Sequence, residues 1–235
     1  MKELAQENIL ITGAASGIGK AAAVLLAAHD ARLFLIDKNK PNLAKVKKAI
    51  RRSKAYLCDV SKEDQVKDTI RQILRKYKTI DVLINNAGIL DYGKIHKQSS
   101  EKWVEVINTN LIGMFFCTKY VLPSMIKRRK GHIINLSSVY GKSASADSSA
   151  YCASKFGIRG LSQSLAQETE RYNIRVTTVH PSTTKTNLFK GTPFKPTKNA
   201  LKPEDIAKAI YEIITSRSTV VVSEIDVVPL HNPYK

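Results

Sequence analysis

The sequence has few cysteines, no long apolar run and no leader-like start, and each absence excludes a class of protein. Its three cysteines, Cys58, Cys117 and Cys152, are an odd number and lack the spacing of a metal site or a CxxC motif, so we expect a reducing compartment. No stretch approaches the ~18 consecutive apolar residues of a membrane helix. Residues 1–8 lack the charged start, apolar stretch and cleavage site of a signal peptide. These observations predict a cytoplasmic protein without a membrane segment.

Histidine is also sparse, and linkers and repeats are absent. The 5 histidines are scattered without ligand spacing, so we expect no metal site. No internal repeat, low-complexity tract or Gly/Ser linker divides the chain. At 235 residues, 43% hydrophobic and 25% charged, the composition excludes a disordered, collagen-like or coiled-coil chain. We predict one domain spanning residues 1–235.

Acidic residues are in short supply, because 38 Lys and Arg stand against 20 Asp and Glu for a net charge of +18. The basic residues are spread along the chain and do not form a basic tail. The densest stretch, residues 38–54, carries the apolar residues Leu43, Val46 and Ile50 at helical spacing, which indicates the solvated face of a helix. A surface for anionic cofactors, acidic proteins or nucleic acid is the alternative. No motif supports specific nucleic-acid recognition.

Short β-branched runs alternate with longer helical patterns along the chain. The runs predict strands at residues 8–12, 32–36, 55–58, 80–84, 131–136, 174–179 and 219–228. The intervening patterns predict helices at residues 17–28, 41–52, 100–126, 149–172 and 203–215, and a further helix capped by Ser61. Almost continuously apolar strands indicate helices on both faces of a parallel sheet. We therefore predict an α/β, doubly wound parallel sheet of about seven strands, with a substrate loop at about residues 187–201.

A glycine-rich turn follows the first strand directly, with Gly13, Gly17 and Gly19 between Thr12 and the first helix. Glycines let the backbone turn tightly and approach a ligand, and the helix N-terminus offers N–H groups and partial positive charge to a pyrophosphate. Asp37, at the end of the second strand, can accept hydrogen bonds from the hydroxyls of an adenosine ribose. Together these features predict a Rossmann-type dinucleotide site.

Asp37 also bears on which dinucleotide binds. A carboxylate there would repel a 2′-phosphate, and Ser16 stands where a basic residue could otherwise reach that phosphate. Lys38 and the basic stretch behind it favour the opposite choice. We expect NAD(H) to be preferred, with NADP(H) as the alternative.

A second pattern combines Tyr151, Lys155 and Ser138. Tyr151 and Lys155 are four residues apart in a helical stretch, so both side chains lie on one face. A phenol with a pKa near 10 is a poor acid or base at neutral pH, and we expect the neighbouring ammonium to lower that pKa. Ser138 follows the fifth strand, so its hydroxyl can reach the same substrate oxygen. The three residues predict general acid/base chemistry on an oxygen atom.

The chain resembles the short-chain dehydrogenase/reductase superfamily, in its compact single-domain type. The matching pieces occur in the family's order: Thr12-Gly-x-x-x-Gly17-x-Gly19, Asp59-Val60, Asn85-Asn86-Ala87-Gly88, Asn110, Ser138, Tyr151-x-x-x-Lys155 and, in part, Pro181-Ser182-x-x-x-Thr186. Ser182 departs from the glycine that usually follows the proline. The resemblance implies an NAD(P)-dependent oxidoreductase that interconverts a secondary alcohol and a ketone.

The resemblance also implies a role for each matching residue. Tyr151 would be the general acid/base, Lys155 would lower its pKa and bind the nicotinamide ribose, and Ser138 would polarise the carbonyl. Asn110 would hold a water in a proton relay. Asp59 would contact adenine, and Thr184 and Thr186 would hold the carboxamide. The implied cofactor contacts are Gly13, Ser16, Gly17, Ile18, Gly19, Asp37, Asp59, Val60, Asn86, Ala87, Gly88, Tyr151, Lys155, Pro181, Thr184 and Thr186.

The substrate and the partners stay open at this point. Substrate-facing positions are expected at Leu90, Tyr92, Val139, Tyr140, Ser145 and the 187–201 loop. One alternative is an NADP(H)-preferring 3-oxoacyl reductase that takes acyl chains from an acidic carrier protein, with residues 127–130 as a basic docking cluster. Another is a dinucleotide-sensing regulator without catalysis. The family usually forms dimers or tetramers through the two long helices, here about residues 100–126 and 149–172, so we expect a homotetramer or homodimer.

Overall fold

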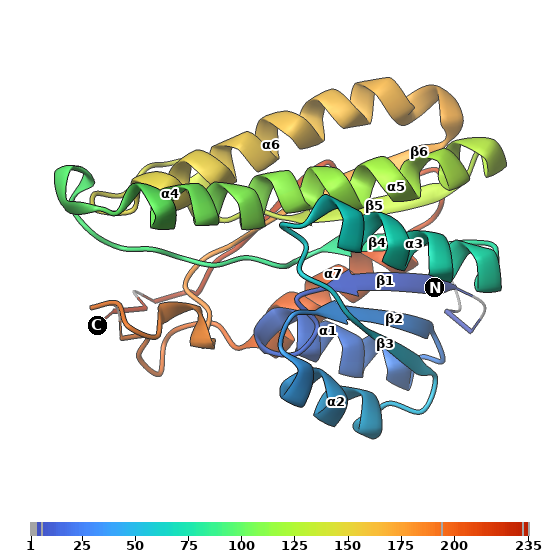
Figure 1. The fold of residues 1–235 in the computed structure, drawn as a ribbon, viewed down its shortest axis with the longest axis horizontal. Helices are drawn as coiled ribbons and strands as arrows, with labels where there is room; N and C mark the ends of the chain where they lie inside the picture. Colours follow the sequence, from blue (N-terminus) through green and yellow to red (C-terminus); the bar gives the residue numbers. More distant parts are fainter. Residues whose placement is uncertain (1–3, 6, 194, 232, 235) are drawn as a thin grey trace.

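The computed structural model describes residues 4–5, 7–193, 195–231 and 233–234. Seven parallel strands form one sheet in the order β3-β2-β1-β4-β5-β6-β7 (Figure 1). The strands are β1 Asn8–Thr12, β2 Arg32–Asp37, β3 Ser53–Leu57, β4 Val82–Asn85, β5 Gly131–Leu136, β6 Ile174–Pro181 and β7 Glu224–Val227. The strand order reverses between β1 and β4, and such a switch point opens a ligand crevice at the carboxyl ends of the strands. The predicted fold class is confirmed.

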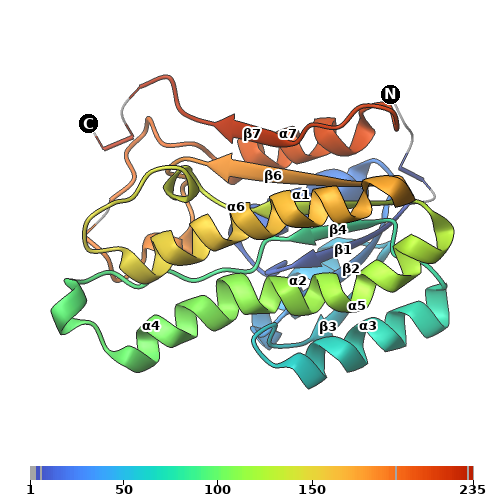
Figure 2. The same cartoon turned by 90° about the horizontal axis from the view of Figure 1, so that it is seen from above.

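Helices cover both faces of the sheet (Figures 1 and 2). The helices are α1 Gly17–Ala28, α2 Lys40–Ala49, α3 Glu63–Tyr77, α4 Ser100–Ile107, α5 Gly113–Arg128, α6 Ser149–Thr169 and α7 Pro203–Thr215. Helices α1, α2 and α7 lie on one face, and α3, α5 and α6 lie on the other. Figure 2 shows α6, α5 and α3 following one another across the second face, with α4 continuing the line of α5 past the sheet. No helix among the described residues has the length and apolar character needed to cross a bilayer.

The alternation of side chains along each strand divides the core into two apolar clusters. In β1, Ile9 and Ile11 pack into the cluster beneath α1 and α7, whereas Leu10 packs into the cluster beneath α3 and α5. In β2, Leu35 and Phe34 divide between the same two clusters. All of these side chains are fully buried, which explains why the strands are apolar at every position.

Several element boundaries differ from the sequence-based predictions. Helix α3 begins at Glu63 after Lys62, and the Ser61 hydroxyl donates to Asp59 Oδ1 at 2.8 Å instead of capping the helix. The last strand is shorter than the predicted 219–228, because β7 Glu224–Val227 pairs only with the end of β6. The other strands and helices that were predicted with bounds overlap their predicted ranges and differ from them by at most three residues at an end.

The predicted long helix at residues 100–126 is interrupted. A π-helical turn, Asn108–Ile112, separates α4 from α5, and α5 then continues to Arg128. Such turns insert an extra residue into a helix and often occur at functional sites. The predicted helix at residues 149–172 ends at Thr169 and continues as a single 3₁₀ turn, Glu170–Tyr172.

Candidate active site

The turn between β1 and α1 is shaped by glycines that cannot be replaced without moving the backbone. Gly13 and Gly17 have positive φ angles of 65° and 52°, which side-chain-bearing residues rarely adopt. A Cβ on Gly19 would lie 2.3 Å from the carbonyl oxygen of Gly13 and 2.5 Å from Nδ2 of Asn86. That amide nitrogen donates to the carbonyls of Thr12 at 2.9 Å and Gly13 at 3.2 Å. The turn is therefore locked to the end of β4.

The turn leads into the N-terminus of α1, which suits an anion. Ser16 is the N-cap residue, and its side chain makes no capping hydrogen bond. The first N–H groups of a helix lack partners within the helix and carry partial positive charge. A site formed by these backbone N–H groups fits the pyrophosphate of a dinucleotide.

Two carboxylates stand at the ends of neighbouring strands. Asp37 accepts hydrogen bonds from the backbone N–H of Ala15 at 2.9 Å and of Asn39 at 2.8 Å, so its carboxylate is held in place beside the turn. Asp59 accepts from both the backbone N–H and the hydroxyl of Ser61. Burial alone would raise the pKa of Asp59, but the Ser61 hydrogen bonds hold it below its ordinary value.

A cavity of about 1040 Å³ runs from the glycine turn to the end of β6, at the upper end of the ~300–1,000 Å³ typical of ligand pockets. It is lined by most of the predicted cofactor-binding residues: Gly13, Ser16, Gly17, Ile18, Asp37, Asp59, Val60, Asn86, Ala87, Gly88, Tyr151, Lys155, Pro181, Thr184 and Thr186. Gly19 does not line the cavity, because it packs against Gly13 behind the turn. These residues fit a dinucleotide. The backbone of the glycine turn suits a pyrophosphate, the carboxylates can accept hydrogen bonds from ribose hydroxyls, and Tyr151 and Lys155 line another part of the same cavity.

The cavity brings Ser138, Tyr151 and Lys155 together. Tyr151 is 8% exposed and Lys155 is 5% exposed, and Lys155 Nζ lies 5.3 Å from the centre of the Tyr151 ring. Lys155 Nζ also donates to the carbonyl of Leu136 at 2.8 Å, which fixes the ammonium at the end of β5. The Ser138 hydroxyl accepts from the Tyr140 N–H at 3.1 Å and donates to the Pro181 carbonyl at 3.5 Å.

The pKa directions in this group correct one sequence-based expectation. Burial raises the pKa of Tyr151, and the hydrogen bond with Ser138 offsets only part of that rise. Burial also lowers the pKa of Lys155 to about 7. The ammonium was expected to lower the pKa of the phenol, but desolvation is the largest effect on both groups and disfavours the charged form of each. In the chain by itself, Tyr151 is therefore a protonated phenol at neutral pH.

Asn110 lies in the π-helical turn and is fully buried. Its Oδ1 accepts from the Ile89 N–H at 2.8 Å, and its Nδ2 donates to the Ile89 carbonyl and to Ser154 Oγ, both at 3.0 Å. The side chain thus ties the segment after β4 to helix α6. It does not line the cavity, and its role in holding a relay water stays a prediction.

The predicted substrate-facing residues divide into two groups. Leu90, Val139 and Tyr140 line the cavity, as does the start of the 187–201 loop, residues 187–190. Tyr92 and Ser145 lie outside the lining. The Tyr92 hydroxyl instead donates to Asp147 at 3.2 Å.

The sequence-based reasoning missed a wall of the cavity that comes from the last residues of the chain. Its members are Val228, Pro229, Leu230, His231, Pro233 and Tyr234. The Tyr234 hydroxyl lies 2.7 Å from Thr183 Oγ1, and the Pro233 carbonyl accepts two hydrogen bonds from Thr197 at 3.0 Å. These contacts join positions more than 30 residues apart, so no local pattern in the sequence pointed to them.

The fold and this site define the class of protein, and the comparisons with known proteins agree. The sequence model of the short chain dehydrogenase family matches residues 7–195, and the chain belongs to this family. The predicted family is confirmed. The chain is an NAD(P)-dependent oxidoreductase that acts on CH–OH groups.

Individual relatives cover nearly the whole chain. A 3-oxoacyl-(acyl-carrier-protein) reductase, FabG, of Thermotoga maritima is 37% identical over 229 residues, which are 92% of this chain and 93% of the relative. A 3-ketoacyl-(acyl-carrier-protein) reductase from Brucella melitensis, solved with NADH, has a TM-score of 0.89 at 26% identity and covers 95% of this chain and 97% of its own. A metagenomic short-chain oxidoreductase solved with NADP has a TM-score of 0.87 at 31% identity, with 98% and 100% coverage.

Proposed function

We propose that the chain interconverts a secondary alcohol and a ketone with NAD(H), using Tyr151 as general acid and base. The observation that carries this proposal is the meeting of Tyr151, Ser138 and Lys155 in one cavity with the glycine turn. Bound NAD(H) supplies or accepts the hydride at the carbon atom. On reduction, Tyr151 gives its proton to the carbonyl oxygen; on oxidation, it takes the hydroxyl proton. Ser138 donates a hydrogen bond to the same oxygen.

The dinucleotide is held by contacts along the cavity. The turn at Gly13 and Ser16 takes the pyrophosphate at the N-terminus of α1, and Asp37 takes the adenosine ribose. Lys155 hydrogen-bonds the hydroxyls of the nicotinamide ribose. Thr186 hydrogen-bonds the carboxamide. The 187–201 loop and the residues near Tyr234 contact the substrate.

NAD(H) is the preferred cofactor because of how Asp37 is held. Its two backbone hydrogen bonds keep the carboxylate beside the turn, where it repels a 2′-phosphate. Lys38, the nearest basic side chain in sequence, is half exposed and lies 4.0 Å from Glu105 Oε1. Steady-state kinetics with both cofactors test this preference. A catalytic efficiency with NADPH equal to or above that with NADH would contradict it.

The direct test of the reaction is the variant Tyr151→Phe. NADH absorbance is followed with a panel of ketones, 3-oxoacyl thioesters, sugars and steroids. We expect the variant to bind NADH, measured by fluorescence titration, and to lose turnover by a factor of about 100 or more. Turnover near that of the wild type would contradict the acid/base role. A wild type that binds NADH and reduces no substrate would favour the sensing regulator.

A 3-oxoacyl reductase that uses NADP(H) and a carrier protein is the second candidate. It is favoured by the likeness to FabG and by the exposed residues Lys127 and Arg129 at the end of α5. Arg128 is not part of this surface, because it donates to Asp81 Oδ1 at 2.7 Å and to the Ile80 carbonyl at 2.8 Å. A preference for carrier-bound over free acyl thioesters, lost in a Lys127→Glu/Arg129→Glu variant, would support this candidate.

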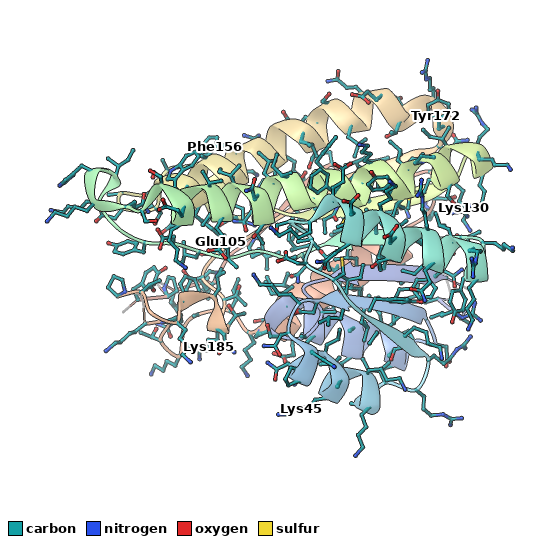
Figure 3. The ribbon with its side chains drawn as sticks, viewed as in Figure 1. Lys45, Glu105, Lys130, Phe156, Tyr172 and Lys185 are labelled. Carbon is teal, nitrogen blue, oxygen red and sulfur yellow. The ribbon has the colours of Figure 1, made fainter. Side chains whose placement is uncertain are left out.

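We also propose a homotetramer or homodimer formed through helices α4, α5 and α6. Three apolar side chains on these helices are 43–49% exposed: Val104, Phe115 and Phe156. Figure 3 shows Phe156 on the outer side of α6.

The basic side chains Lys45, Lys130 and Lys185 lie far apart in the same view, as expected for a dispersed positive charge. The three cysteines are free and buried, which agrees with a cytoplasmic location.

A further inference from the structure

His180 is a fully buried histidine that the proposed reaction leaves without a role. It lies in β6 directly before Pro181, and its Nδ1 is 3.0 Å from the backbone carbonyl oxygen of Ser138. A carbonyl only accepts hydrogen bonds, so Nδ1 carries the proton. Burial lowers the pKa of His180, which keeps the ring neutral at neutral pH with its single proton on this bond.

The end of β6 contacts both polar groups of Ser138, its backbone carbonyl and its side-chain hydroxyl. His180 holds the backbone carbonyl, and the carbonyl of Pro181 accepts the Ser138 hydroxyl at 3.5 Å. A distance of 3.5 Å is long for a bond between two oxygens, so the hydroxyl can leave Pro181 for a substrate oxygen at little cost. The His180 bond, at 3.0 Å, has the usual length of an N–H···O bond and is buried. The Gly141 N–H donates to the same carbonyl at 2.8 Å, so these two contacts together fix the position of the serine backbone.

The other side of the His180 ring meets a group of charged side chains. Nε2 lies 3.6 Å from Glu224 Oε2, which is beyond hydrogen-bond distance. Glu224 itself accepts from Arg159 Nε at 2.9 Å and from Gln163 Nε2 at 3.0 Å, and Lys142 Nζ lies 3.4 Å away. This group ties β7 to helix α6 and to the turn after Ser138. The ring is held between it and the serine.

We propose that His180 is a positioning residue of the oxidoreductase reaction. Its Nδ1–H bond to the Ser138 carbonyl sets the direction in which the Ser138 hydroxyl points beside Tyr151. The inference rests on the proposed role of Ser138 in polarising the substrate carbonyl. It assigns no proton transfer and no substrate contact to the histidine.

Two substitutions distinguish the effect of losing the hydrogen bond from the effect of losing the volume of the His180 ring. His180→Leu keeps a similar volume and removes the Nδ1–H donor, so that the Ser138 carbonyl keeps only its hydrogen bond from the Gly141 N–H at 2.8 Å. We expect kcat to fall about threefold to tenfold, with the dissociation constant for NADH within about twofold of wild type. His180→Asn places an amide nitrogen near the position of Nδ1, and we expect it to recover most of the lost kcat.

A double-mutant cycle with Ser138→Ala shows whether the effect passes through the serine. In the Ser138→Ala enzyme, the added His180→Leu change should lower kcat little further, because there is no hydroxyl left to direct. The matched control is His132→Asn, at a buried histidine of β5 that does not line the cavity. It should lower the melting temperature without changing kcat.

Each outcome bears on the inference. A folded His180→Leu enzyme with wild-type kcat overturns it, and so does an undiminished loss in the Ser138→Ala background. If His180→Leu does not fold, the comparison is made with His180→Gln, whose longer amide reaches past the Nδ1 position; a wild-type kcat there overturns the inference equally. Full turnover of Ser138→Ala and Tyr151→Phe would instead overturn the proposed function, which keeps the two failures distinguishable.

Discussion

Glu224 offers a quantitative test of the electrostatics at the end of the sheet. Its carboxylate accepts hydrogen bonds from Arg159 and Gln163 and pairs with Lys142. These partners, Arg159 first, lower the pKa of Glu224 from 4.5 to about 2. The substitution Glu224→Gln removes the charge and keeps the shape of the side chain.

The size of the effect follows from the pKa and the exposure of the partners. At about 1.4 kcal/mol for each pKa unit, the lowered pKa of Glu224 corresponds to about 3 kcal/mol in the free energy of unfolding before solvent screening. The side chains of Lys142 and Arg159 are 30% and 36% exposed, so screening reduces the contribution to about 1–2 kcal/mol. For a chain of this length, we expect Glu224→Gln to lower the melting temperature by about 2–8 °C at pH 7.

The sign of the pH dependence follows from linkage. A carboxyl group whose folded-state pKa is depressed contributes stability above its unfolded pKa and loses it as the pH falls through the folded pKa. The contribution of Glu224 is therefore complete above about pH 4.5 and declines toward pH 2. The difference between wild type and Glu224→Gln should narrow over that range.

Thermal unfolding followed by circular dichroism at pH 7, 5, 4 and 3 measures this difference. Glu212→Gln, at an exposed position of α7, is the matched control and should change the melting temperature by less than 1–2 °C, since a surface substitution is worth about 0.5 kcal/mol or less. Equal melting temperatures of wild type and Glu224→Gln at pH 7 would refute the reasoning. A difference that stays constant down to pH 3 would refute the assignment of the pKa.

Three further predictions concern the glycine turn, the lysine and the outer helices. Gly19→Ala should weaken NADH binding, measured by calorimetry, at least about tenfold, because the new Cβ would lie 2.3 Å from the Gly13 carbonyl oxygen and force the turn to move. The control Gly160→Ala, with no atom within 4 Å of its new Cβ, should bind NADH normally. NADH affinity should fall as the pH rises through about 7, where free Lys155 loses its proton, and Lys155→Met should give a flat profile by fluorescence titration. Light scattering should report a smaller oligomer for Phe115→Asp/Phe156→Asp, and an unchanged mass would count against the α4–α6 interface.

Much of the fold was predictable because its signals are local. The β-branched runs located the strands, and the glycines after β1 located the turn, since the residues that form each feature are adjacent in sequence. Tyr151 and Lys155 share a helix face because they are four residues apart, which needs no tertiary information. Most of the residues that the family motifs predict to contact the cofactor line one cavity.

The failures have a common physical cause. The boundary of β7 depends on how much of β6 is left to pair, and the interruption at Asn108–Ile112 appears in no residue pattern. The pKa directions of Tyr151 and Lys155 depend on burial, which is a property of everything packed around them. Sequence spacing shows that the Tyr151 and Lys155 side chains are close, but not that both are removed from water.

The alternation of strands and helices, the glycine turn and the candidate catalytic side chains could be predicted from the order of residues alone, because periodicity and spacing act over a few residues. Three features became visible only in the folded chain: Tyr234 forms part of the cavity wall, Asn110 ties Ile89 to Ser154, and His180 lies against Ser138. These contacts join residues that are 21 to 51 positions apart. Distances of that kind depend on how the whole sheet and its helices pack, and no short stretch of sequence carries them.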